Sequence, residues 1–366
     1  MALRSHVLTA CIAAATACLI VTAAWAHPQS AEAATVTTIV STPGKIKRVR
    51  VKGDYVAWME QPDNNSCIKL LRMYRISTSQ QRQVGGCQGG DNSSVGATWT
   101  AEVKLALQHD GQVFWSRIDG GNITDVNVRA SSFAGNKSTS TLYSLSHDTG
   151  SNMGVHLSGL DADGTIGVFS VWNRLHLNVF GCMADGDDSD CPVAVGGSLH
   201  RINSNLVWGD TGELTSLTVD SGYVQMTRTP GIGLERFGPG LGSLPTLAVG
   251  NIAAQAHGDY HAVVLRRPTP STAVLVAYPD NGGPSVSRSI SPTVANEIAF
   301  DGARIIFRDG TDIRSWVLGD VSTHHVATAA STPIGLATDG ARIVWAENVS
   351  GTGRVRTVTL PAINAV

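Results

Sequence analysis

Seven charged residues occupy equivalent places in the chain, each two positions after a bulky apolar residue near the end of an expected strand. Side chains two apart on a strand share a face, so each charge should lie beside the bulky residue. Arginine binds carboxylates and sulfates through two parallel hydrogen bonds, which predicts a ring suited to acidic ligands. Alternatively, the charges cap packed interfaces, with arginine stacked on tryptophan or paired with glutamate. The seven are Glu60, Arg117, Arg174, Arg228, Arg266, Arg308 and Glu347.

The strands that carry these charges follow a recurring glycine turn. The stretches IAFDGARIIFRDG (298–310) and LATDGARIVWAEN (336–348) repeat almost the same pattern. A two-residue Asp-Gly connection between apolar strands favours a hairpin, because both turn residues take positive φ and glycine does so without strain. Related turns occur at Gly53, Gly111, Gly164, Gly222, Gly258, Gly302 and Gly340.

These turns divide the chain into repeated units. Consecutive turn glycines are 36 to 58 residues apart, and each unit holds about four short β-like runs without helical periodicity. Such repeats predict an all-β fold, a β-propeller of seven four-stranded blades. Six or eight blades stay open, because Val207 and Trp208 resemble an additional strand. We expect residues 35–42 to supply the outermost strand of the last blade, which removes an exposed sheet edge.

The two Asp-Gly-Ala-Arg turns carry a family resemblance. They resemble the repeat of TolB-like, WD-like propellers, in which an Asp-Gly turn leads into an apolar strand with an aromatic residue. Phe300 and Thr338 stand where that family commonly has proline. The resemblance implies a propeller fold and assigns no functional residue.

The first 26 residues have the character of an export signal. Arg4 precedes an apolar run, and Ala24-Trp25-Ala26 is a small-x-small cleavage site. We expect cleavage after Ala26, a flexible linker over 27–34 and a single propeller domain over 35–366. The cleaved protein should be secreted or extracytoplasmic without a membrane span. An uncleaved anchor is the alternative, since about 18 apolar residues can just cross a bilayer.

Four cysteines lie beyond this segment. In an exported chain they predict disulfides, Cys67 with Cys87 across a hairpin and Cys182 with Cys191 around a short loop. Zinc is the competing interpretation, although no Cys-x-x-Cys spacing occurs. Asp185, Asp187, Asp188 and Asp190 suggest Ca²⁺, but their spacing matches no calcium loop, and a solvated acidic loop tip explains them as well. We therefore expect no metal and no cofactor.

Other acidic residues cluster at the glycine turns, where aspartate commonly bonds local backbone amides. A metal site is the competing interpretation, and we expect the structural role for the whole group, which comprises His109, Asp110, Asp161, Asp163, His257, Asp259, Asp301 and Asp339.

The charge balance and motifs narrow the function. With 27 basic and 29 acidic residues, the chain is not expected to bind nucleic acid through bulk charge. No sequence motif of a hydrolase elbow, a zinc protease or a phosphate-binding loop occurs. We expect a monomeric, exported binding or scaffolding module that recognises a protein or an anionic polysaccharide through one loop face. The alternative is a carbohydrate-active enzyme, hydrolase or lyase, with its site at the channel mouth.

Overall fold

The computed structural model divides the chain into two units, Met1–Glu32 and Ala33–Val366. All the residues that it describes lie in the second unit, and the side chains of some strand residues are outside that description. The described ranges are 35–61, 70–86, 104–119, 123–135, 140–148, 153–163, 167–175, 198–201, 206–208, 213–220, 223–229, 233–238 and 243–361. The expected signal peptide, the linker, the four cysteines and Asp185, Asp187, Asp188 and Asp190 lie outside these ranges, so they stay predictions.

Within the described ranges, the secondary structure consists of strands, and no helix there is long and apolar enough to cross a membrane. The first half of the strands is β1 (Thr37–Thr42), β2 (Lys45–Lys52), β3 (Tyr55–Gln61), β4 (Leu70–Arg75), β5 (Gln80–Gly86), β6 (Leu105–Leu107), β7 (Gln112–Asp119), β8 (Ile123–Ser132), β9 (Ser140–Asp148), β10 (Met153–Ala162), β11 (Gly167–Leu175), β12 (Ser198–Arg201), β13 (Leu206–Trp208) and β14 (Glu213–Asp220). The second half is β15 (Tyr223–Thr229), β16 (Leu234–Phe237), β17 (Ser243–Leu247), β18 (Ile252–Gly258), β19 (His261–Arg266), β20 (Ala273–Pro279), β21 (Val286–Ile290), β22 (Val294–Phe300), β23 (Arg304–Asp309), β24 (Asp312–Val317), β25 (His324–Thr328), β26 (Ile334–Thr338), β27 (Arg342–Val349) and β28 (Thr352–Thr359).

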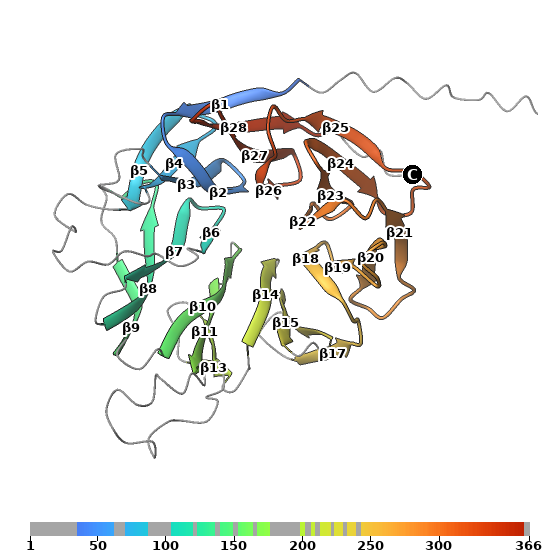
Figure 1. Ribbon diagram of the computed structural model, residues 1–366, viewed down its shortest axis with the longest axis horizontal. Coiled ribbons are helices and arrows are strands. Elements are labelled where there is room, and N and C mark those ends of the chain that lie inside the picture. The colour runs from blue at the N-terminus through green and yellow to red at the C-terminus, as the bar shows by residue number, and fades with distance from the viewer. Residues whose placement is uncertain are drawn as a thin grey trace, which may run out of the picture. The chain divides into compact units, whose positions relative to one another are not determined.

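The described strands pair into seven four-stranded antiparallel sheets (Figure 1). Six sheets take four consecutive strands each, namely β2–β5, β6–β9, β10–β13, β14–β17, β18–β21 and β22–β25. The seventh has the order β1-β28-β27-β26, and we call it the closing sheet. Val207 and Trp208 belong to β13, the fourth strand of its sheet.

The first strands of neighbouring sheets contact one another around a closed circuit. β2 contacts β6 and β26, and the series continues through β10, β14, β18 and β22 back to β26. Sheets arranged around one axis in this way define a β-propeller, so the predicted fold is confirmed at this level. Where the structure describes these residues, the turn between the first and second strands lies beside the same turn of the next sheet, as at Gly53 beside His109 and Gly302 beside Asp259. We call this end of the ring the turn face. We call the other end the loop face.

Apolar side chains pack between neighbouring sheets and hold the ring together. Val49 and Trp58 of the first sheet pack with Val344 and Val355 of the closing sheet. The bulky residue that precedes each charge was expected at such an interface, and its burial is confirmed at Trp58, Trp115, Met226, Val264, Ile306 and Trp345. Burying a large apolar side chain contributes about 1.5–3 kcal/mol, so each of these positions stabilises the ring by an amount of this order.

The ring is closed by the first described strand, as predicted. β1 pairs antiparallel with β28, with Thr37 opposite Thr357 and Thr42 opposite Gly353. Asn348 of β27 links the closing sheet to the neighbouring sheet: Ile46 N of β2 donates to Asn348 Oδ1 (2.9 Å), and Asn348 Nδ2 donates to Ile46 O (3.0 Å). The Asn348 side-chain amide therefore makes the pair of hydrogen bonds to Ile46 that a residue of a neighbouring strand would make.

The turns differ in detail from the prediction. Asp301 N donates to Arg304 O (3.2 Å), so Gly302 and Ala303 form the turn, rather than Asp301 and Gly302. Positive φ is found at the glycine alone, 95° at Gly302 and 89° at Gly340. The prediction that Asp301 and Gly302 are the two turn residues is therefore wrong. The aspartate precedes the turn and accepts hydrogen bonds from its backbone. Its carboxylate accepts the backbone amides of Ala303 (3.0 Å) and Arg304 (2.6 Å).

Candidate functional site

Two members of the predicted charged ring, Glu60 and Glu347, are buried and paired within the protein. Arg72 Nε donates to Glu60 Oε2 (2.7 Å), and the Thr42 hydroxyl donates to Glu60 Oε1. Glu347 accepts from Arg356 (3.1 Å) and from the backbone amide of Ala330 (2.8 Å). In both sheets the arginine stands directly opposite the tryptophan of the Trp-x-Glu pattern. These two glutamates therefore tie together the strands and the sheet boundary around them.

Arg308 is also engaged inside the ring, whereas Arg266 is more open. Arg308 forms an ion pair with Glu297 (3.1 Å) and donates to Pro333 O (2.5 Å). Arg266 is itself partly buried, and its Nε donates to Gly250 O (3.1 Å) in a bond that is exposed to solvent. Arg117, Arg174 and Arg228 lie on β7, β11 and β15, but their side chains are outside the described part of the structure. Ligand binding by these four arginines stays a prediction.

On the turn face, the aspartates at Asp110, Asp301 and Asp339 bond local amides, as predicted. Gln112 N donates to Asp110 (2.9 Å), and the amides of Ala341 (3.0 Å) and Arg342 (2.9 Å) donate to Asp339. Among the residues that the structure describes, no group of three histidine, cysteine or carboxylate side chains is placed to hold a metal ion.

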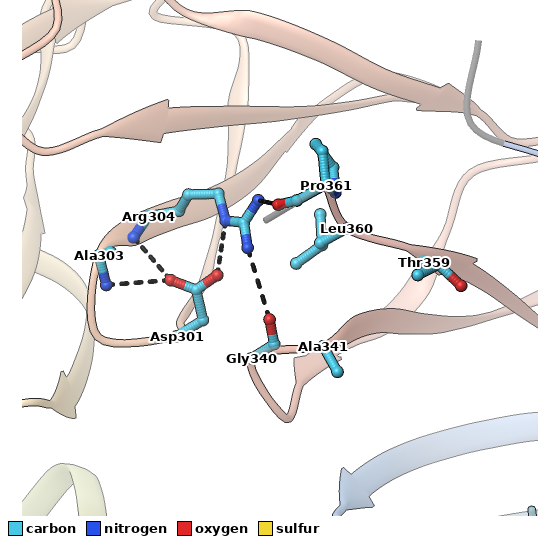
Figure 2. A pocket seen from close by; sticks show the side chains of 8 residues that line it. All are labelled: Asp301, Ala303, Arg304, Gly340, Ala341, Thr359, Leu360 and Pro361. Carbon is cyan, nitrogen blue, oxygen red and sulfur yellow. Dashed lines mark hydrogen bonds and ion pairs between the residues drawn. The ribbon is translucent and has the colours of Figure 1, made fainter. Parts of the chain in front are cut away.

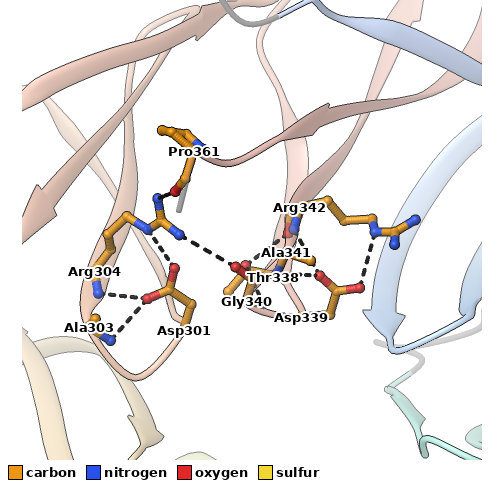
Figure 3. A network of polar contacts seen from close by, with 9 residues as sticks. All are labelled: Asp301, Ala303, Arg304, Thr338, Asp339, Gly340, Ala341, Arg342 and Pro361. Atoms are coloured by element: carbon orange, nitrogen blue, oxygen red, sulfur yellow. Dashed lines mark hydrogen bonds and ion pairs between the residues drawn. The ribbon is translucent and has the colours of Figure 1, made fainter. Parts of the chain in front are cut away.

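The two Asp-Gly-Ala-Arg turns place their arginines differently. Arg304, 7% exposed, pairs with Asp301 (2.6 Å) and donates to two carbonyls of the closing sheet, Pro361 O (2.8 Å) and Gly340 O (3.4 Å). Arg342 pairs with Asp339 (3.2 Å) and is 29% exposed, and its guanidinium points away from the Arg304 group (Figure 3). One repeated motif therefore supplies a link between sheets in one copy and a partly open arginine in the other.

A shallow pocket of about 410 Å³ lies between these two turns (Figure 2). Ala303, Ala341, Leu360 and Pro361 give it apolar walls, and Asp301 and Arg304 contribute polar atoms. The Arg304 guanidinium already bonds the carbonyls around it. We therefore regard this pocket as part of the sheet boundary.

A group of charges crosses the inside of the ring at the turn-face end. Lys52 of β2 pairs with Asp220 of β14 (3.0 Å), although two other sheets lie between theirs around the ring. Asp161 of β10 accepts from the amides of Val219 (2.8 Å) and Ala162 (3.0 Å). Burial raises the pKa of Asp161 above its ordinary value, against the opposing effect of nearby Arg50, these amide bonds and Lys52.

The raised pKa of Asp161 predicts a specific pH dependence. A carboxyl whose pKa is higher in the folded state binds its proton more tightly there, so acidification through that pKa stabilises the folded protein. Relative to Asp161→Asn, the wild type should therefore gain stability as the pH falls from 7 toward about 4. Melting temperatures of the two proteins across this range check the sign. A wild type whose melting temperature falls relative to that of the variant on acidification would contradict the prediction.

The most distinctive group on the turn face joins the sheets β14–β17 and β18–β21. Arg236 donates to Asp280 (2.8 Å) and to Pro245 O (3.2 Å), and His257 Nε2 bonds the second Asp280 oxygen (2.9 Å). These three side chains are nearly inaccessible, with His257 only 1% exposed. Because these side chains are enclosed, the group supports the surface above it.

Two tyrosines rest on this buried base. Tyr223 stacks on His257 with ring centroids 4.7 Å apart, and Tyr260 meets Tyr223 edge-on at 6.3 Å with an angle of 87° between the planes. Burial, with the Asp280 charge, raises the pKa of Tyr223, so its phenol stays protonated at physiological pH. Tyr260 is 65% exposed. The arrangement is a buried polar support, a half-buried ring and an exposed ring above them.

The backbone that presents Tyr260 is strained. Asp259 and Tyr260 have φ of 39° and 60°, in the region that favours glycine. Gly53, Gly111, Gly302 and Gly340 take positive φ at the corresponding turns of other sheets. A left-handed residue other than glycine costs about 1–2 kcal/mol. Sequence reasoning treated Gly258 as the turn glycine and missed Tyr260, although His257-Gly-Asp-Tyr-His261 is the aromatic-rich exception among the turns.

Comparisons with known proteins agree with the fold. No protein-family model matches the chain, and no curated protein matches it in sequence. A chain from the mitotic checkpoint complex matches with TM-score 0.51 and 11% identity, over 88% of this chain and 93% of that one. The WD40 β-propeller domain of Doa1 matches with TM-score 0.52 and 9% identity, over 88% and 96%.

A third similar structure is a prolyl endopeptidase, with TM-score 0.50 and 9% identity over 88% of this chain. This chain corresponds to only 46% of that enzyme chain. At such low identities the likeness concerns the fold alone. The protein is thus a β-propeller protein, and its resemblance to WD-like and TolB-like propellers holds at the level of fold.

Proposed function

We propose that this chain is a protein-binding module that contacts its partner on the turn face through Tyr260. The observation that carries the proposal is the exposed Tyr260 ring on a strained turn, supported from below by Tyr223 and His257. Tyrosines held rigidly over a packed base are typical of the few residues that dominate binding energy at interfaces. Backbone strain retained at an exposed aromatic residue is a further sign of function.

The scaffold suits this role, because a closed ring of sheets holds its surface turns in fixed positions. One solved structure of similar fold comes from a protein assembly, the mitotic checkpoint complex. We further propose that each four-stranded sheet is one blade of a seven-bladed ring, and that the protein is exported by its first 26 residues. Recognition of an acidic partner by Arg117, Arg174, Arg228 and Arg266 on the loop face remains a second proposal, favoured by the open setting of Arg266.

Partner capture with three single variants separates these surfaces. Tyr260→Ser removes the turn-face aromatic residue, Arg266→Ala removes a loop-face cation, and Val321→Ser alters an 85% exposed apolar residue elsewhere as a matched control. We expect Tyr260→Ser to lose proteins that the wild type and Val321→Ser both retain, because an interface aromatic commonly contributes 2 kcal/mol or more. Quantitative mass spectrometry of the retained proteins is the measurement. Retention unchanged in Tyr260→Ser but lost in Arg266→Ala would move the contact to the loop face.

A further inference from the structure

The tripeptide Gly-Asp-Tyr occurs at two turns, and its first copy binds an arginine of the same chain. In Gly53-Asp54-Tyr55, the Arg75 guanidinium lies 5.8 Å from the centroid of the Tyr55 ring. Arg75 Nε also donates to Asp54 Oδ2 (2.8 Å). The aspartate and the tyrosine thus hold one cation between them, by an ion pair and by its attraction to the aromatic face.

The second copy, Gly258-Asp259-Tyr260, is shifted by one residue in its hairpin. Lys52 pairs with Tyr55 across the first turn, whereas Gly258 pairs with His261 across the second, so Tyr260 lies in the turn itself. The residue that follows the third strand of each sheet bonds the turn with the same one-residue shift. Ile76 N bonds Asp54 O, and Asp280 N bonds Tyr260 O. The residue that precedes Ile76 is Arg75, but the one that precedes Asp280 is Pro279.

This shift leaves the second copy without its own cation. Within the described ranges, no ion pair to Asp259 and no cation over the Tyr260 ring is found. His261 Nδ1 bonds the backbone oxygen of Asp259 (2.8 Å), and Arg236 is buried and bonded to Asp280 and Pro245. The second copy therefore presents the same two recognition groups, carboxylate and ring, toward solvent.

The surroundings add a second aromatic wall. Tyr223 and Tyr260 form a corner of two rings at 87°, and the Asp280 charge acts on the Tyr223 phenol. Faces of tyrosine rings attract cations by about 0.5–1 kcal/mol at exposed sites, and more where water is displaced. Arginine suits such a corner better than lysine, because its planar guanidinium can stack on a ring while it donates to a carboxylate.

We propose that Asp259, Tyr260 and Tyr223 recognise an arginine side chain of a protein partner, in the manner in which Asp54 and Tyr55 hold Arg75. This inference rests on the proposed role of Tyr260 as a contact and adds the chemistry of what it contacts.

The test uses the full chain labelled with 3-fluorotyrosine, which gives one ¹⁹F signal for each of its six tyrosines. The probe is the peptide Gly-Arg-Gly-Arg-Gly, compared with the same peptide carrying neutral citrulline in place of arginine. We expect the arginine peptide to shift the Tyr260 and Tyr223 signals and to leave that of Tyr55 unchanged, since Arg75 already occupies that ring. Tyr260→Leu, which keeps the net charge, and Asp259→Asn should each weaken binding about threefold to tenfold.

Two results would overturn the inference. One is a citrulline peptide that binds as tightly as the arginine peptide, and the other is an affinity that neither substitution changes. If partner capture needs Tyr260 but the arginine peptide shifts no tyrosine signal, the proposed function stands and the arginine inference fails. If capture does not depend on Tyr260 either, both fail.

Discussion

Arg304→Ala is expected to lower the free energy of unfolding by about 3 kcal/mol, because it leaves a buried carboxylate without its cation. The Asp301 side chain is only 2% exposed and pairs with Arg304 at 2.6 Å. The same guanidinium bonds Gly340 O and Pro361 O of the closing sheet (Figure 3). The substitution therefore also removes a link between neighbouring sheets and leaves two carbonyls short of a donor.

Arg342→Ala is the matched control, since the same four residues surround it in sequence. Its pairing distance to Asp339 is longer, 3.2 Å, and the side chain is partly exposed. Asp339 is itself only 4% exposed, but water reaches the Arg342 guanidinium, and within the described ranges it bonds no carbonyl of another sheet. We therefore expect Arg342→Ala to cost only about 1 kcal/mol. Urea unfolding followed by tryptophan fluorescence gives both free energies. Losses that agree within about 1 kcal/mol would contradict the role of Arg304 as an inter-sheet link.

The contrast between these arginines shows what sequence reasoning can reach. The repeated Asp-Gly-Ala-Arg-Ile pattern predicts two hairpins, and both are found. It does not show which carbonyls of the next sheet each arginine meets. Those are contributed by Gly340 and Pro361 for Arg304, the latter 57 residues further along the chain.

The Trp-x-Glu pattern gives a similar lesson at the loop face. The sequence correctly placed Trp58 and Trp345 in packed interfaces and Glu60 and Glu347 beside them. Whether such a glutamate faces a ligand or a neighbour depends on the strand opposite it, where Arg72 and Arg356 stand. Once the third strand is aligned with the second, an arginine opposite the tryptophan predicts an ion pair with the glutamate inside the protein.

Contacts across the ring have no signal of this kind. Lys52 and Asp220 are 168 residues apart and lie in sheets that are not neighbours. Only the size of the ring and the register of β2 and β14 bring them together. The one-residue shift that exposes Tyr260 is equally hidden, because Gly-Asp-Tyr reads the same at both of its turns.

We call the pairing of β1 with β28, which closes the ring, the seam. It should tolerate no side chain at Gly353. A Cβ there would lie 2.4 Å from Gly44 O and 2.8 Å from Ile46 Cγ1, far inside van der Waals contact. Gly353 pairs with Thr42 of β1, and Gly44, whose carbonyl would be crowded, lies in the link between β1 and β2. A backbone atom cannot turn aside as a flexible side chain can. Gly353→Ala must therefore push β28 away from the strand that closes the ring.

We expect Gly353→Ala to cost at least about 3 kcal/mol, at the upper end of what overpacking causes. Gly351→Ala in the same hairpin is the control: it meets no atom within 4 Å and adds only the strain of its φ of 83°, about 1–2 kcal/mol. Urea unfolding measures both, and hydrogen exchange of the Thr37–Thr42 amides reports on the seam itself. Since opening the seam frees β1 first, Gly353→Ala should speed exchange in β1 more than in β20. Equal protection of β1 in the two variants would mean that the closing strand is held by contacts other than its pairing beside Gly353.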